Sequence, residues 1–160
     1  MQPPVIWDAQ TGQVLLTLQS ETGDLKPLWF GLAWSPDGKK LAAVGSLMHL
    51  ASGADEGMIL VWNAETGQQE QLLMAGMNGY RLWAVAWSPD SLLLACGTTG
   101  SELFVWNMVN HTPLAILQGH RDIIDRLAWA PSPDRTFLAS VARDGTLQIW
   151  DLSSFASGTH

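Results

Sequence analysis

Apolar and polar residues follow one another along this chain in short blocks rather than in long helical stretches. Runs of four to seven residues rich in Val, Ile, Leu and Trp recur, as in ILVW at 59–62 and LQIW at 147–150, and turn-forming residues separate them. Short β-branched and aromatic runs bounded by Gly, Pro, Asn or Asp are typical of β-strands. No segment shows a convincing helical period, so the pattern predicts an all-β protein.

The strand-like runs repeat in three registers that move together. The first register ends in a Trp followed by Asp or Asn, at Trp7, Trp62, Trp106 and Trp150. The second reads LAWSPDG at 32–38, VAWSPDS at 85–91 and LAWAPSPD at 127–134, and the third follows each of these as KLAAVGS, LLLACGT and FLASVAR. The last full units are 42 to 44 residues long, and four short strands in such a length match one blade of a β-propeller.

The final unit carries the fullest set of motifs. Gly119-His120, AWAPSPD, LASVARDG and LQIWD occur in that order, and this order resembles a blade of the WD-repeat β-propeller family. The resemblance covers nearly the whole chain. It implies a buried hydrogen-bonded tetrad, and residue by residue it assigns this structural tetrad to His120, Ser140, Asp144 and Trp150. Such a network fixes one arrangement of strands, because buried polar groups must be paired.

The strand pattern predicts a β-propeller segment of four-stranded antiparallel blades, with about 13 strands in an incomplete ring. We expect one WD-repeat segment over 1–160 with four parts: a partial blade at 5–18, a blade at 28–74 with an insertion near 46–56, a blade at 81–118, and a blade at 123–151 that lacks its outer strand. The chain is interpreted as a fragment of a longer propeller or a gene model truncated at both ends. The alternative is a half-propeller that forms a six-bladed ring from two chains.

Composition and charge narrow the possible function classes. A formal net charge of −7 argues against a nucleic-acid or anionic-membrane surface. No apolar run approaches the ~18 residues that span a membrane, and the N-terminus does not resemble a signal peptide. The single Cys96 cannot form an internal disulfide, which favours a soluble cytoplasmic protein. The His residues lack metal-ligand spacing, and no cofactor is expected.

Candidate protein-binding residues lie where the repeat is irregular. The insertion SLMHLASGADE at 46–56 contains Met48 and His49. It follows the second strand of its blade, unless HLASGAD is itself that strand, in which case the insertion lies on the other face. Trp29, Phe30, Trp83 and Asp125 stand where the innermost strands begin. The repeat does not explain Trp29 and Trp83, and Arg81 and Arg126 add hydrogen-bonding anchors. Trp and Arg are enriched in interface hot spots, although both Trp residues could instead pack between blades.

We therefore expect a non-catalytic protein–protein interaction scaffold that binds protein partners of unknown identity. Its open strand edges also allow self-association. One alternative is the sensor region of a larger signalling ATPase or kinase. A propeller enzyme is less favoured. Ser140, His120 and Asp144 include the residue types of a hydrolytic triad, but their spacing matches the blade and no nucleophile elbow accompanies them.

Overall fold

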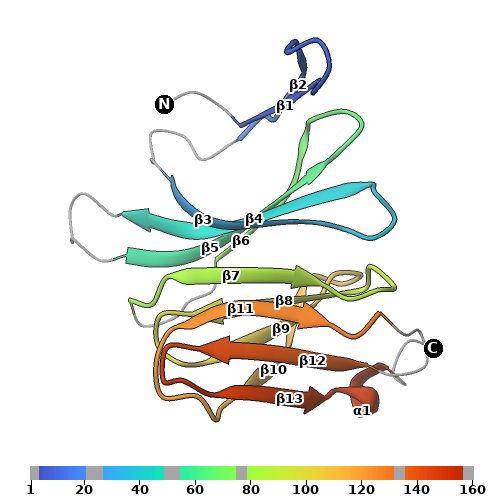
Figure 1. The fold of residues 1–160 in the computed structure, drawn as a ribbon. Helices are drawn as coiled ribbons and strands as arrows, with labels where there is room; N and C mark the ends of the chain where they lie inside the picture. Colours follow the sequence, from blue (N-terminus) through green and yellow to red (C-terminus); the bar gives the residue numbers. More distant parts are fainter. Residues whose placement is uncertain (1–3, 21–26, 49–54, 75–78, 132–135, 157–160) are drawn as a thin grey trace.

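The computed structural model describes residues 4–20, 27–48, 55–74, 79–131 and 136–156 of the chain. These residues form thirteen strands and one short helix. The strands make four antiparallel sheets that follow one another in chain order through the molecule (Figure 1). The prediction of an all-β propeller segment with about 13 strands is therefore confirmed.

Each sheet is formed by strands that are consecutive in the sequence. The terminal hairpin pairs β1 (Val5–Trp7) with β2 (Val14–Thr17). The first blade contains β3 (Pro27–Trp34), β4 (Lys40–Met48), β5 (Asp55–Asn63) and β6 (Gln69–Met74). The second blade contains β7 (Leu82–Trp87), β8 (Leu93–Thr98), β9 (Leu103–Asn107) and β10 (Thr112–Leu117). The third blade contains β11 (Ile124–Trp129), β12 (Phe137–Ala142) and β13 (Leu147–Asp151), and the one-turn helix α1 (Ser153–Ala156) follows it.

The insertion of the first blade lengthens its central hairpin. β4 and β5 each have nine residues and stay paired from Lys40↔Asn63 to Met48↔Asp55. The alternative in which HLASGAD forms the second strand is wrong, because β4 already occupies Lys40–Met48. The insertion therefore connects β4 to β5. Residues 49–54 lie outside the described residues.

The turn between the first two strands of a blade is built by a Ser and an Asp. In the first blade the Ser35 hydroxyl donates to Asp37 Oδ1 at 2.6 Å and accepts from the Lys40 backbone N–H at 2.9 Å. Ser88 and Asp90 repeat this arrangement in the second blade. The chain then reverses through a left-handed residue, which is Gly38 at φ 72° in the first blade and Ser91 at φ 63° in the second. The SPDG and SPDS motifs therefore encode the same turn.

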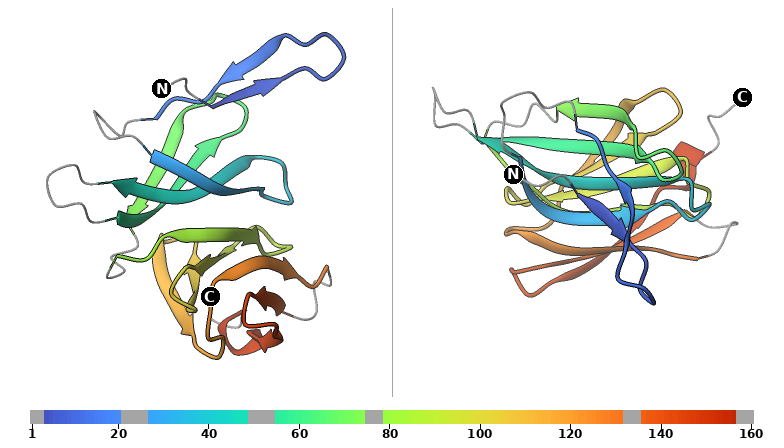
Figure 2. Two further views of the ribbon diagram at one scale, coloured as in Figure 1. Left: turned by 60° about the vertical axis from the view of Figure 1, so that its left-hand side comes forward. Right: turned by 90° about the horizontal axis from the view of Figure 1, so that it is seen from above.

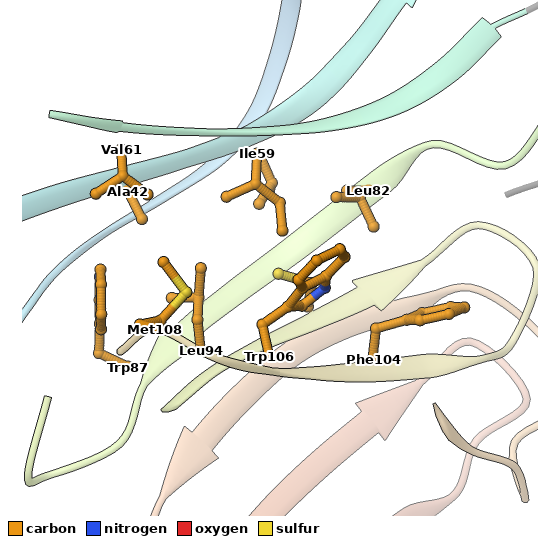
Figure 3. Packing of buried hydrophobic residues seen from close by; sticks show 11 residues of the cluster. Ala42, Ile59, Val61, Leu82, Trp87, Leu94, Phe104, Trp106 and Met108 are labelled. Atoms are coloured by element: carbon orange, nitrogen blue, oxygen red, sulfur yellow. The ribbon is translucent and has the colours of Figure 1, made fainter. Parts of the chain in front are cut away.

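Each complete blade buries both of its faces. One face of the first blade packs on the second blade through Ala42, Val44, Ile59 and Val61 (Figure 3). Its other face packs on the terminal hairpin through Leu41, Met58, Leu60 and Trp62. The second blade packs on the third in the same way, through Leu93, Ala95, Leu103 and Val105. Blade-to-blade packing of alternating side chains is therefore the main source of the core.

The innermost strands β3, β7 and β11 lie next to one another in consecutive blades (Figures 1 and 2). Indole groups link them: Trp87 Nε1 donates to the Ala33 carbonyl at 3.1 Å, and Trp129 Nε1 donates to the Ala86 carbonyl at 3.0 Å. The approach is close at Gly31, where a Cβ would lie 2.9 Å from the Trp83 carbonyl oxygen. Ala84 and Arg126 occupy the equivalent positions of the second and third blades, three residues before Trp87 and Trp129 as Gly31 is three residues before Trp34.

The two ends of the array remain open. β2 pairs with β1 and not with β13, and the terminal hairpin lies at the opposite end of the array from the third blade (Figure 1). Leu147 and Ile149 of β13 are 63% and 68% exposed, whereas their equivalents in the inner blades, Ile59, Val61, Leu103 and Val105, are fully buried. The third blade therefore presents an uncovered apolar face. None of the helical residues described forms a segment long and apolar enough to cross a membrane.

Candidate functional site

The four tetrad residues predicted from the sequence lie together in the third blade. His120 Nε2 is 2.7 Å from Ser140 Oγ, and Ser140 Oγ accepts a hydrogen bond of 2.9 Å from Trp150 Nε1. On the other side of the imidazole ring, Nδ1 is 2.8 Å from Thr146 Oγ1 and 3.5 Å from the Asp144 carboxylate. Thr146 is a fifth member of the network, and the sequence motifs did not point to it.

The network has one consistent direction of donation. Trp150 can only donate to Ser140, so the Ser140 hydroxyl proton is free to donate to His120 Nε2. The Thr146 hydroxyl donates to Asp144 Oδ1 at 2.6 Å and therefore accepts from His120 Nδ1. In this assignment Nδ1 of His120 donates, Nε2 accepts, and each member of the network has a partner.

Asp144 anchors the network to the turn between β12 and β13. Its carboxylate accepts from the hydroxyl and the backbone N–H of Thr146 and from the backbone N–H of Arg121 at 2.7 Å. These hydrogen bonds, those from Thr146 first, lower the pKa of Asp144 from 3.8 to about 2. The carboxylate thus joins the segment that holds His120 to the turn that begins with Asp144.

The equivalent Trp residues of the other blades have different partners. Trp62 Nε1 donates to the Gln19 carbonyl at 2.6 Å. Trp106 Nε1 is buried and has no hydrogen-bond partner among the described residues. Cys96 occupies the position that Ser140 holds in the third blade; it is fully buried, and burial raises the pKa of its thiol. In the described residues, the complete tetrad therefore belongs to the third blade.

The contacts of Ser140, His120 and Asp144 superficially suit a hydrolytic triad. The Ser140 side chain, however, is 1% exposed, and its oxygen already bonds both the indole of Trp150 and the imidazole of His120. A hydroxyl in this setting has no space for a substrate carbonyl. The described residues also contain no group of three or more His, Cys, Asp or Glu side chains that could hold a metal ion.

A second group of predicted residues lies at the start of the innermost strands. In each blade, the pairing of the first strand with the second shifts register once. The shift falls at Phe30 in the first blade, at Trp83 in the second and at Asp125 in the third. Each is thus the extra residue of a β-bulge. Bulges re-aim a side chain and interrupt pairing, and they are common beside functional sites.

The three bulge residues are connected across the blades by aromatic and cationic contacts. The rings of Phe30 and Trp83 are stacked, with centroids 4.8 Å apart and planes 20° apart. Arg81 lies 5.8 Å from the Phe30 ring, Arg143 lies 5.5 Å from the Trp83 ring, and Arg143 Nε is 3.0 Å from the Asp125 carboxylate. We call these five residues the bulge row: Phe30, Arg81, Trp83, Asp125 and Arg143.

The remaining candidates lie elsewhere. Trp29 turns away from the bulge row and packs edge-on against Trp62, with ring centroids 5.7 Å apart, beside an apolar groove of about 350 Å³. Met48 ends β4, but its side chain and the whole of His49 lie outside the described residues. Sequence reasoning missed Arg143, because it belongs to the turn after β12 rather than to an innermost strand. The one sequence feature that could have pointed to Arg143 is its position directly before the Asp144-Gly145 turn.

Four antiparallel sheets in series, with interlocking innermost strands, define a partial β-propeller. The family model "WD domain, G-beta repeat" (WD40) matches residues 12–63, 71–107 and 111–151. The chain belongs to the WD40 repeat family, as its motif order indicated. Members of this class act as protein-interaction scaffolds.

Relatives and solved structures agree with this assignment. The chain is 31% identical over 155 residues to cell division cycle 20.6, cofactor of APC complex, of Arabidopsis thaliana, with coverage of 92% of this chain and 33% of that protein. It is 30% identical over 152 residues to the human telomerase Cajal body protein 1, with coverage of 94% and 26%. The structure of U3-55K has a TM-score of 0.65 at 20% identity, with coverage of 84% and 41%. The chain thus spans about a third or less of the length of the two curated relatives, and 41% of the U3-55K chain.

Proposed function

We propose that this chain is a non-catalytic scaffold that binds a protein partner through the bulge row. The observation that carries the proposal is the continuous contact of bulge residues from three blades, which presents two aromatic rings and two guanidinium groups on a rigid sheet edge. Trp and Arg dominate the energetics of many interfaces. The contacts among these side chains hold them in place before a partner arrives, which reduces the conformational entropy lost on binding.

The similarity to proteins named as a cofactor of the APC complex supports a protein partner. The burial of Ser140 supports the absence of catalysis at the tetrad, and we propose that the tetrad is structural. We further propose that the chain functions as part of a larger propeller or multidomain protein. One such protein would be a signalling ATPase or kinase in which this chain is the sensor region. A cytoplasmic location remains a prediction.

The test compares two Trp→Ala substitutions on the innermost strands. Peptides are selected from a random display library on the immobilised chain, and their dissociation constants are measured for wild type, Trp83→Ala and Trp34→Ala. Trp34 is a matched control, since it is 47% exposed and lies at the other end of β3. We expect Trp83→Ala to weaken binding at least about tenfold and Trp34→Ala to leave it nearly unchanged. Equal affinities for Trp83→Ala and wild type would overturn the proposal.

Unfolding of Trp83→Ala must be separated from a binding defect. Trp83 is partly exposed and stacks on Phe30 at its edge, so its loss should leave the thermal midpoint within a few degrees of wild type. A second variant, Phe30→Leu, keeps an apolar side chain and removes the stacked ring. Weakened binding in both variants with intact folding supports the interface. Unfolding of Trp83→Ala together with wild-type affinity in Phe30→Leu contradicts it.

A second candidate function is self-association into a ring, because the open face of β13 carries Leu147 and Ile149. At the other end, Leu32 of β3 is 68% exposed, while its equivalent Val85 packs against the first blade. By continuity of the repeat, the β13 face of one copy would pack on the β3 face of another. Arg126 lies on the same face as these β13 residues by strand alternation, and the terminal hairpin already covers the β4 and β5 part of the first blade, so the ring would require the hairpin to give way to the β13 face.

Complementary variants test this association. Leu147→Asp/Ile149→Asp blocks one face and Leu32→Asp blocks the other, and Val109→Asp is the control because Val109 is 63% exposed on a turn. Sedimentation should show a wild-type dimer, monomers of each face variant alone, and a 1:1 complex when the two face variants are mixed. A monomeric wild type, or a control that also dissociates, would contradict the ring.

A further inference from the structure

Arg143 in the bulge row is held from three directions. Its backbone N–H donates to the Ile123 carbonyl at 2.9 Å. Its Nε donates to both oxygens of Asp125, at 3.0 and 3.2 Å, and its guanidinium lies 5.5 Å from the ring centroid of Trp83. The position of the guanidinium is therefore defined before any partner arrives, although the side chain is 48% exposed. Such preorganisation reduces the entropy lost on binding.

The terminal nitrogens of Arg143 are not used by the fold. Nε makes the contacts with Asp125, whereas Nη1 and Nη2 donate no hydrogen bond to any described residue. Two adjacent Nη groups present a planar set of donors, which matches the two oxygens of a carboxylate. The exposure of the side chain leaves this set accessible to another molecule.

The surroundings of Arg143 favour an anionic group over a cationic one. Both Asp125 oxygens already accept from Arg143, and a second guanidinium is close by, since Arg126 Nη1 donates to the Asp125 backbone carbonyl at 2.7 Å. The Asp125 carboxylate is therefore already paired with one guanidinium and lies beside a second. A lysine or arginine of a partner would find the carboxylate occupied and would meet like charge.

The aromatic pair beside Arg143 selects for an apolar neighbour. The stacked rings of Phe30 and Trp83 are partly exposed, and Arg143 covers one part of the Trp83 ring. A ligand whose carboxylate reaches the Nη groups would place its next side chain on these rings. Apolar burial and a charge-assisted hydrogen bond would then act within one short segment.

We infer that the bulge row recognises a peptide segment in which an Asp or Glu lies next to an apolar or aromatic residue, with the carboxylate on Arg143 and the apolar side chain on Phe30 and Trp83. This inference rests on the proposed function, because it names the chemistry of the partner at the same surface. The specificity belongs to Arg143, and the aromatic rings supply sequence-tolerant contact area.

The test uses the full chain and peptides selected from a random display library. Wild type should enrich peptides that contain Asp or Glu beside an apolar residue. For one such peptide, Arg143→Gln should weaken binding about tenfold or more, and replacing the peptide's Glu with Gln should have a similar effect. The two changes together should cost little more than either alone, because they remove the same contact. The charge-matched control is Arg121→Gln, which should bind like wild type, since Arg121 is exposed and its side chain makes no hydrogen bond or ion pair with a described residue.

Two results separate the failure of this inference from the failure of the proposed function. Peptides that require Trp83 but tolerate Glu→Gln, or that carry Lys or Arg instead, would overturn the acidic partner and leave the interface in place. Peptides whose affinity is unchanged in both Trp83→Ala and Arg143→Gln would overturn both. Equal weakening by Arg121→Gln and Arg143→Gln would show a general charge effect and would also overturn the assignment to Arg143.

Discussion

The Nε1 nitrogen of Trp129 donates to the carbonyl oxygen of Ala86 across a blade boundary at 3.0 Å, and Trp87 makes the same contact with Ala33 one blade earlier. Trp34 occupies the equivalent place in the first blade and is 47% exposed, because no innermost strand precedes β3 in the described structure. One residue type in one register thus acts as an inter-blade link twice and remains on the surface once.

Phenylalanine at these positions should have unequal effects. Trp87→Phe removes a hydrogen bond and part of a buried ring, so we expect it to lower the free energy of unfolding by about 2 kcal/mol. Trp34→Phe should change it by less than about 0.5 kcal/mol. Urea unfolding followed by circular dichroism measures both. Equal losses at the two positions would show that the indole–carbonyl contact does not join the blades.

The hydrogen bond between Trp150 and Ser140 can be measured by a double-mutant cycle. Ser140→Ala leaves both the indole N–H and His120 Nε2 without a partner, and should lower the free energy of unfolding by about 2 kcal/mol. Trp150→Phe removes the donor. The double variant should lose about 1 kcal/mol less than the sum of the two single losses, because both partners are then absent. Strict additivity in equilibrium unfolding would contradict a direct interaction.

The lowered pKa of Asp144 predicts a specific dependence of stability on pH. A carboxyl group with a folded pKa of about 2 and an ordinary value of 3.8 stabilises the fold above the higher value and loses this effect as the pH falls through the lower one. The difference in thermal midpoint between wild type and Asp144→Asn should therefore be constant above about pH 5 and shrink between about pH 4 and pH 2.

Thr146→Val provides the control for this pH dependence, because the Thr146 hydroxyl is the main cause of the lowered pKa. An NMR titration should show the Asp144 pKa of this variant closer to its ordinary value. A wild-type advantage that grows with acidification would disprove the role of the ionised carboxylate.

The left-handed turn residues predict opposite effects of reciprocal substitutions. Ser91 has φ 63° and Gly38 has φ 72° at equivalent places. A residue with a Cβ is strained in this conformation, so Ser91→Gly should raise the free energy of unfolding and Gly38→Ser should lower it, each by about 1 kcal/mol. Differential scanning calorimetry measures both changes. The same sign for the two variants would show that another interaction determines the turn, such as the 3.3 Å contact of Ser91 Oγ with the Asp37 backbone N–H.

Repetition made the fold predictable from the sequence. The spacing of Trp62, Trp106 and Trp150 and the SPD turns placed strands and blades without reference to other parts of the chain, because each strand pairs with its neighbour in sequence. Local pairing of this kind leaves little for long-range contacts to alter. The insertion at 46–56 was ambiguous for the opposite reason, since a longer hairpin and a displaced strand have similar apolar patterns.

The candidate site was less predictable, because it depends on relationships between blades. Counting back from the register Trp residues identified Phe30, Trp83 and Asp125, but periodicity alone does not show which of them fall on bulges. It grouped Trp29 with Phe30, although the two side chains of adjacent strand residues point in different directions. Arg143 and Thr146 entered the two networks through the turn after β12, and a turn motif does not reveal what its side chains will contact.

Gly31, Ala84 and Arg126 occupy one equivalent position in three successive blades. A Cβ at Gly31 would lie 2.9 Å from the backbone of the next blade, and a guanidinium-bearing side chain at that place would be excluded altogether. The units are therefore not interchangeable modules. Any blade that packs on the third blade must therefore leave room for the exposed side chain of Arg126, at the place where the first and second blades carry Gly31 and Ala84.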